Sequence, residues 1–190
     1  MPRIPRLLIA AVLLCAAAAA LLLAIRWYEE SFREAGERAA MFSGEALKLP
    51  AELAGPGPVR LVHFWDPACP CNVGNQQHLA EMLLRYRDAP VAFYAVQRPG
   101  SRGKLPPPLQ AIETLTDFPG SETLPASPAV ALWDARGELV YLGPYSEGAV
   151  CTSDNSFVEP IIDALLAGRQ VRATQALAVA CFCDWPHNAR

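Results

Sequence analysis

Two cysteines separated by a single proline, Cys69 and Cys71, are the residues of this sequence best suited to chemistry. They follow the apolar run Val59–Trp65, which is typical of a buried strand, and they precede residues 72–88, where leucines recur at helical spacing. Unpaired backbone N–H groups at a helix N-terminus stabilise a thiolate over a thiol, and the pKa of a cysteine there can fall to roughly 3.5–7.5. The pattern therefore predicts that Cys69 is a nucleophile near neutral pH.

The elements around this turn predict an α/β domain. A second apolar strand at Val91–Val96 completes a strand, helix, strand unit, which is parallel and right-handed at this length. Ala129–Trp133 and Glu138–Leu142 predict an antiparallel hairpin, because Asp134–Gly137 between them has turn chemistry. We also expect a short helix over Leu109–Phe118, a closing helix that ends at Gly168 and an added strand over Ala176–Cys183.

The run from Phe64 through Cys69 to Cys71 resembles the active-site turn of thioredoxin-like proteins, especially bacterial membrane-tethered thiol-disulfide oxidoreductases. Ser127-Pro128 and the hairpin after it are similar to the family's cis-proline loop and β-hairpin. The resemblance implies a thioredoxin-like fold, with a central mixed sheet flanked by helices. It also implies that Cys69 attacks and that the Pro128 loop pairs with a bound thiol or peptide.

The resemblance assigns supporting roles to three further residues. His63 stands where thioredoxin carries a buried acid, so it is a candidate proton relay, although a lone histidine in a strand is more often a core residue. Trp65 would offer an apolar surface to the substrate, and Ser127 precedes the proline of the loop.

The sequence departs from the family pattern because only Pro70 separates its cysteines, where the family has two residues. Residues i and i+2 of a regular helix do not share a face, so a disulfide between Cys69 and Cys71 requires an irregular turn. We expect Cys71 to be the resolving thiol. Two unreactive cysteines buried at a turn are the alternative.

Three other cysteines, Cys151, Cys181 and Cys183, follow the hairpin, and the last two repeat the Cys-x-Cys spacing. They could form a structural disulfide that ties the tail to the domain, which would contribute about 2–4 kcal/mol. They could also form a second redox pair that exchanges with Cys69. The sequence leaves the connectivity open.

Metal binding competes with exchange, because two Cys-x-Cys pairs supply soft thiolates that suit Cu(I) or Zn(II). No histidine lies at a recognised spacing from the cysteines, so we assign no metal ligand and expect no cofactor. A non-enzymatic thioredoxin-like domain of the cell envelope is a third alternative.

The N-terminus predicts a membrane anchor. Residues 7–25 carry no charge and span roughly 28 Å as a helix, which matches the hydrocarbon core of a bilayer. Arg3 and Arg6 precede this run and Trp27 and Tyr28 follow it, so the positive-inside rule puts the N-terminus in the cytoplasm. A cleaved signal peptide is the alternative.

These features predict a single-pass protein of the cell inner membrane with its domain in the periplasm. Its expected partners are extracytoplasmic protein thiols or disulfides and a membrane or periplasmic redox protein. A formal net charge of -3 argues against nucleic-acid binding. The expected divisions are residues 1–6 in the cytoplasm, 7–25 as transmembrane anchor, 26–45 as stalk or linker, 46–172 as thioredoxin-like domain and 173–190 as Cys-containing extension.

Overall fold

The computed structural model describes residues 6–34, 37–148 and 153–185, so the predictions for Cys151 lie outside the described residues. The chain forms two units, residues 1–34 and residues 35–190. The first unit is helix α1 (Arg6–Glu34), whose segment Ile9–Tyr28 is long and apolar enough to cross a membrane.

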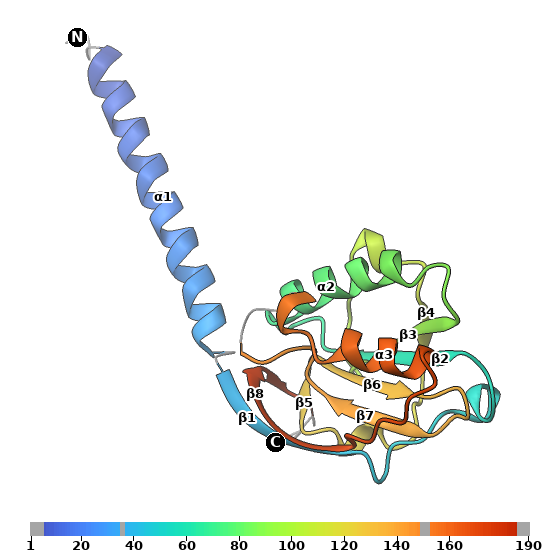
Figure 1. Cartoon of the computed structure of the whole chain (residues 1–190). Helices are drawn as coiled ribbons and strands as arrows, with labels where there is room; N and C mark the ends of the chain where they lie inside the picture. The colour runs from blue at the N-terminus through green and yellow to red at the C-terminus, as the bar shows by residue number, and fades with distance from the viewer. Residues whose placement is uncertain (1–5, 35–36, 149–152, 186–190) are drawn as a thin grey trace. The chain divides into compact units, whose positions relative to one another are not determined.

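The second unit is built on a five-stranded mixed sheet in the order β4-β3-β2-β6-β7 (Figure 1). Strand β2 is central: it pairs in parallel with β3 and antiparallel with β6, and β7 completes the hairpin predicted from the sequence. The bounds are β2 (Val59–Trp65), β3 (Val91–Gln97), β4 (Glu113–Leu115), β6 (Ala129–Trp133) and β7 (Leu139–Gly143). This mixed sheet, with its parallel β2-α2-β3 unit and its antiparallel hairpin, is the thioredoxin-like fold that the sequence predicted.

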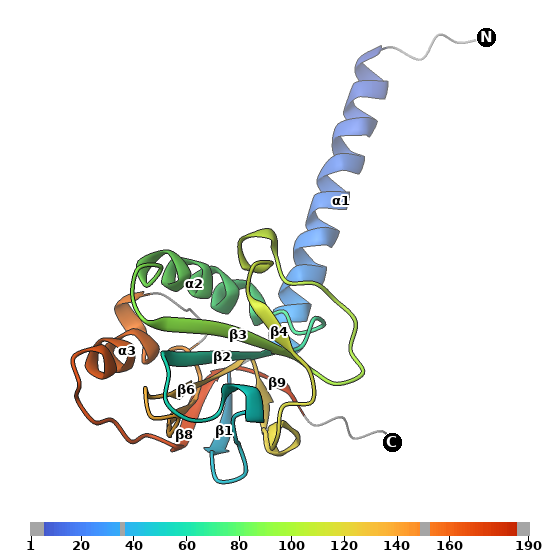
Figure 2. The same cartoon turned by 90° about the vertical axis from the view of Figure 1, so that its right-hand side faces the viewer.

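Two helices cover one face of the sheet, α2 (Asn72–Arg85) and α3 (Val158–Leu166), as Figure 2 shows. Leu79 and Met82 of α2 and Ile162 of α3 are fully buried in one apolar cluster with Leu61 of β2. The hydroxyl of Ser156 accepts hydrogen bonds from the backbone N–H groups of Val158 and Glu159, so Ser156 satisfies the first backbone donors of α3.

Segments from both ends of the second unit cover the opposite face. Strand β1 (Glu37–Ser43) pairs antiparallel with β8 (Gln175–Cys181), and β5 (Ala126–Ser127) pairs with β9 (Cys183–Asp184). Phe42 is buried there in one cluster with Phe64 of β2 and with Phe182 and Trp185 of the C-terminal tail, residues 173–185. The C-terminal extension is thus part of the core, which Ala176–Cys183 already suggested by its apolar composition.

Two segments differ from the expectations. Residues 37–43, which were expected to belong to the stalk or linker at 26–45, form β1, because β8 supplies a strand partner and Phe42 a buried side chain. The helix expected over Leu109–Phe118 is wrong: a short 3-10 turn at Pro107–Leu109 is followed by β4, which adds to the edge of β3. Pairing with an existing strand edge outweighs weak helical propensity in so short a segment.

Candidate active site

The turn between β2 and α2 is held by polar contacts. The carboxylate of Asp66 accepts a hydrogen bond from the backbone N–H of Ala68 at 3.1 Å and forms a 2.8 Å ion pair with Arg98. The side-chain amide of Asn72 donates to the carbonyl oxygen of Asp66, and Cys71 is the N-cap of α2. These contacts fix the backbone that carries both cysteines.

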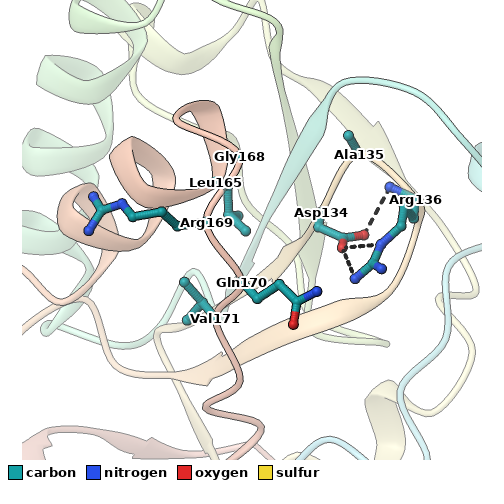
Figure 3. Close-up of a pocket in the computed structure, with 8 residues that line it drawn as sticks. All are labelled: Asp134, Ala135, Arg136, Leu165, Gly168, Arg169, Gln170 and Val171. Carbon is teal, nitrogen blue, oxygen red and sulfur yellow. Dashed lines mark hydrogen bonds and ion pairs between the residues drawn. The ribbon is translucent and has the colours of Figure 1, made fainter.

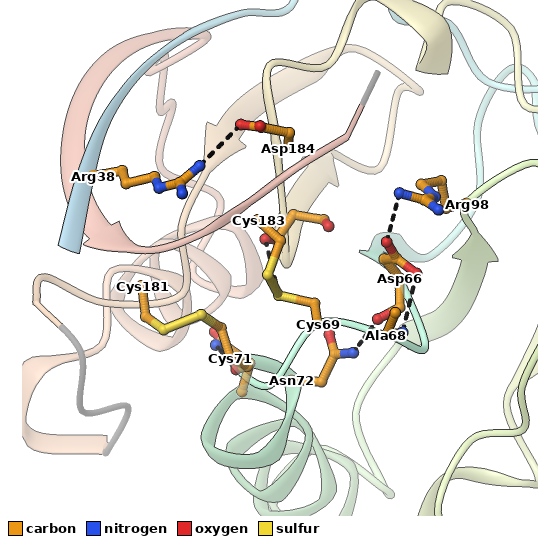
Figure 4. The surroundings of a disulfide bond; sticks show 12 residues. Arg38, Asp66, Ala68, Cys69, Cys71, Asn72, Arg98, Cys181, Cys183 and Asp184 are labelled. Carbon is orange, nitrogen blue, oxygen red and sulfur yellow. Dashed lines mark hydrogen bonds and ion pairs between the residues drawn. A yellow bond between two sulfur atoms is a disulfide. The ribbon is translucent and has the colours of Figure 1, made fainter. Parts of the chain in front are cut away.

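Each cysteine of the turn is joined to a cysteine of the tail (Figure 4). Cys69 forms a disulfide with Cys183, and Cys71 forms one with Cys181. The expected pair within the turn is therefore replaced by two parallel bridges between the Cys-x-Cys motifs. Cys69 is only 3% exposed, so in this oxidised state it is not the accessible nucleophile that the resemblance implied.

The tail occupies the edge of the cis-proline loop. The Ser127-Pro128 peptide bond is cis, as the resemblance implied. Cys183 is the strand partner of Ser127, whose carbonyl oxygen lies 3.6 Å from Sγ of Cys69. The chain thus places its own cysteine beside Pro128, where the resemblance implies that a bound thiol should lie.

Core contacts hold the tail in this position. Trp185 is buried, its indole N–H donates to the carbonyl oxygen of Ser121 at 2.7 Å, and its ring meets Phe64 edge-on. Phe182, which separates the two tail cysteines in the sequence, is buried and contacts the ring of Phe42. Sequence reasoning identified the cysteines of this segment but not the roles of Phe182 and Trp185. Two aromatic residues in a short apolar segment could have indicated that it packs into the core.

Two supporting residues of the sequence prediction are buried on the helix-covered side of the sheet. Trp65 is 4% exposed, so it offers little surface to a substrate. His63 is fully buried, and its Nδ1 lies 2.8 Å from the hydroxyl of Tyr145 rather than near a cysteine sulfur. Burial lowers the pKa of His63 to about 3, so its imidazole is neutral at neutral pH and poorly suited to accept a proton.

This burial predicts an acid dependence of stability. Between pH 6.5 and about 3 the unfolded chain binds a proton on His63 that the native state does not bind, so stability falls as the pH is lowered. The slope from this one group is at most about 1.4 kcal/mol per pH unit. Denaturant titrations of the full chain in detergent at pH 7, 6 and 5 measure it.

The control is a pair of histidine variants. His63→Gln should lose this slope, whereas His78→Gln should keep it, because His78 is the other buried histidine of the described domain and leaves His63 in place. An unchanged slope in His63→Gln would show that His63 does not cause the acid dependence.

A surface pocket of the described domain lies between the β6–β7 turn and the end of α3 (Figure 3). Asp134 at its rim accepts hydrogen bonds from Arg136 and from the backbone N–H of Glu138. These contacts stabilise the hairpin turn. The pocket contains none of the predicted site residues, so we assign the chemistry to the cysteine centre.

Residues 38–185 match the family model described as "Domain of unknown function (DUF6436)". The chain belongs to the DUF6436 family. The matched region covers the whole described sheet and includes both Cys-x-Cys motifs of this DUF6436 protein. The tail is therefore part of the family domain and not an appendage to it. No curated protein matches the chain.

Solved structures resemble this DUF6436 protein at low sequence identity. A hypothetical protein from Sinorhizobium meliloti 1021 is 21% identical, with 82% of this chain and 95% of that chain covered and a TM-score of 0.51. An uncharacterized conserved protein from Geobacillus kaustophilus is 19% identical, with 82% and 93% covered and a TM-score of 0.53. The dsbF structure from MTB, in mixed oxidized and reduced forms, is 20% identical, with 58% and 82% covered and a TM-score of 0.43.

Sequence reasoning missed the ion pair that braces the turn. Arg98 begins a segment rich in proline, glycine and basic residues, a composition typical of a solvated loop, yet it pairs with Asp66. A signal existed: the two residues directly follow the parallel strands β2 and β3, whose last residues, Trp65 and Gln97, are in register. Residues that follow neighbouring parallel strands meet at the same edge of the sheet.

Proposed function

We propose that this chain is a membrane-anchored thiol-disulfide oxidoreductase of an extracytoplasmic compartment, with an exchange centre made of Cys69, Cys71, Cys181 and Cys183. One observation carries the proposal. The disulfide between Cys69 and Cys183 lies beside the cis-proline loop, because Cys183 is the strand partner of Ser127, whose carbonyl oxygen is 3.6 Å from Sγ of Cys69. This is the arrangement expected of an enzyme cysteine joined to a bound partner, here supplied by the same chain.

The exchange begins at the more accessible sulfur. Cys183 is partly exposed and Cys69 is buried, so a thiolate of a partner dithiol attacks Sγ of Cys183 and expels Cys69 as the thiolate. Cys69 lies two residues before the N-cap of α2, where a thiolate leaves readily because the helix N-terminus stabilises it. The partner's second thiol then resolves the mixed disulfide: the partner dithiol becomes a disulfide, and Cys69 and Cys183 become thiols.

Two observations support the cellular setting. Segment Ile9–Tyr28 of α1 is apolar enough to span a membrane, and arginines precede it while Trp27 and Tyr28 lie at its end. Disulfides persist in oxidising compartments outside the cytoplasm. We therefore propose a single-pass inner-membrane protein with a periplasmic domain, whose partners are periplasmic or membrane-bound thiol proteins.

A Cys183→Ser variant tests this proposal with oxidised glutathione as the probe. Without Cys183, the Cys69 thiolate should attack glutathione disulfide and form one mixed disulfide, with release of one glutathione thiolate. Mass spectrometry of peptides should find the adduct on Cys69. Intact spheroplasts should give the same adduct, because oxidised glutathione is charged and does not cross the bilayer.

The matched control is the double variant Cys69→Ser, Cys183→Ser, which should carry no adduct at this centre. An unmodified Cys69 in the purified, folded Cys183→Ser protein would overturn the exchange function. An adduct in purified protein but not in spheroplasts would overturn the proposed orientation.

A further inference from the structure

The oxidised centre brings four sulfur atoms together from two distant segments of the chain. Sγ atoms of Cys69, Cys71 and Cys183 all lie within 4.8 Å of one another, and Cys181 is bonded to Cys71. Figure 4 shows the two bridges side by side, between the turn before α2 and the tail strands. Reduction would therefore produce four thiols in one small volume.

Reduction should leave these thiols close together, because the tail is held by more than its disulfides. β8 pairs with β1 along its whole length, and β9 pairs with β5. Phe182 and Trp185, which precede and follow Cys183 in the sequence, are both buried. The hydrogen bond from Trp185 to Ser121 does not depend on the disulfides. The turn is held separately by Asp66 and its partners, so neither Cys-x-Cys motif depends on the bridges for its position.

Four such thiols match the coordination chemistry of a soft cation. Zinc bonds to thiolate sulfur at about 2.3 Å, so the sulfurs of a tetrahedral site lie about 3.8 Å apart. The three sulfurs within 4.8 Å of one another need only small side-chain rotations to reach this spacing. Cys181, once released from Cys71, can supply the fourth ligand, and three thiolates already suffice for Cu(I).

We propose that the reduced protein binds one soft d10 cation, Zn²⁺ or Cu⁺, through Cys69, Cys71 and Cys183, and that Cys181 supplies the fourth thiolate that Zn²⁺ requires. Two equivalents of a partner dithiol reduce the two disulfides to four thiols and become two disulfides themselves. The cation then displaces the thiol protons as it binds. Oxidation by two equivalents of a protein disulfide re-forms both bridges and releases the cation, so metal affinity follows the redox state of the centre.

The test uses the full chain in detergent, reduced with a phosphine under anaerobic conditions and titrated separately with Zn²⁺ and with Cu⁺ against a chromophoric chelator. The reduced protein should bind about one equivalent of cation, and the oxidised protein none at this centre. Cys69→Ser, Cys71→Ser and Cys183→Ser should each weaken binding at least tenfold, since loss of even an outer contact to a metal ligand costs about 10–100-fold.

Two further variants provide a control outside the centre and identify the number of ligands. Cys15→Ser, which removes the exposed cysteine of α1, should bind as the wild type does. Cys181→Ser should weaken Zn²⁺ binding and leave Cu⁺ binding nearly intact, because only Zn²⁺ requires the fourth thiolate. Failure of the reduced, folded wild type to bind either cation would overturn the metal site, while the glutathione capture at Cys69 would still stand.

Discussion

Replacing Cys69 by serine should slow the oxidation of a partner dithiol by about 100-fold, because serine cannot form the bridge whose leaving thiolate is stabilised at the start of α2. The second bridge, between Cys71 and Cys181, remains in this variant. Its cysteines are both buried, so a partner thiolate reaches it slowly. Stopped-flow measurement of the reaction between the oxidised protein and a dithiol peptide gives the rate constant.

The matched variant is Cys71→Ser, which also removes one of the two bridges between the same segments but keeps the one between Cys69 and Cys183. It should retain the rate of the first exchange step within about threefold, because the leaving thiolate is unchanged. Equal losses in both variants would mean that the bridges act only as structural cross-links. Cys15→Ser should react at the wild-type rate, because its thiol lies in α1, outside the exchange centre.

Replacing Trp185 by alanine should lower the free energy of unfolding of the domain by about 3–5 kcal/mol, the cost typical of truncating a buried large aromatic side chain. Trp185 is 2% exposed, contacts Phe64 and donates a hydrogen bond to the carbonyl oxygen of Ser121. The variant loses the apolar burial, opens a cavity and leaves that oxygen without its donor. Guanidinium unfolding of the oxidised full chain in detergent, followed by circular dichroism, measures the loss.

A control from the same tail is Leu177→Ala in β8. Leu177 is 69% exposed, so this variant should change the free energy of unfolding by less than about 0.5 kcal/mol. If Trp185→Ala were equally mild, Trp185 would not help to hold the tail. The expectation that reduction leaves four thiols together would then rest on strand pairing and Phe182 alone.

The tail covers the cysteine that, by the resemblance to thioredoxin-like proteins, would attack a partner directly, because Cys183 is bonded to Cys69. An open cis-proline loop can accept an extended segment of a partner, whereas here Ser127 already pairs with Cys183. Under the proposed function, a partner thiolate would therefore reach the partly exposed sulfur of Cys183 rather than Cys69 itself.

The sequence by itself determined the features that depend on local pattern. The apolar run Val59–Trp65 predicted β2, and the leucines at helical spacing after Cys69 predicted the turn and α2. Both predictions were possible because hydrophobic periodicity is a property of neighbouring residues. The Ser127-Pro128 motif and the hairpin after it were predicted from the resemblance, and both are present. The long helix at the N-terminus was predicted from the uncharged apolar run 7–25, and its segment Ile9–Tyr28 is long and apolar enough to cross a membrane.

Only the tertiary structure decided which cysteines are joined and which segments share a strand edge. The pairing of residues more than a hundred positions apart, such as Cys69 and Cys183, cannot be deduced from the residues around them. Residues 37–43 form a strand because β8 lies beside them, not because of their own propensity. The neutral, buried state of His63 likewise depends on packing against Tyr145, since burial in the folded core sets its pKa.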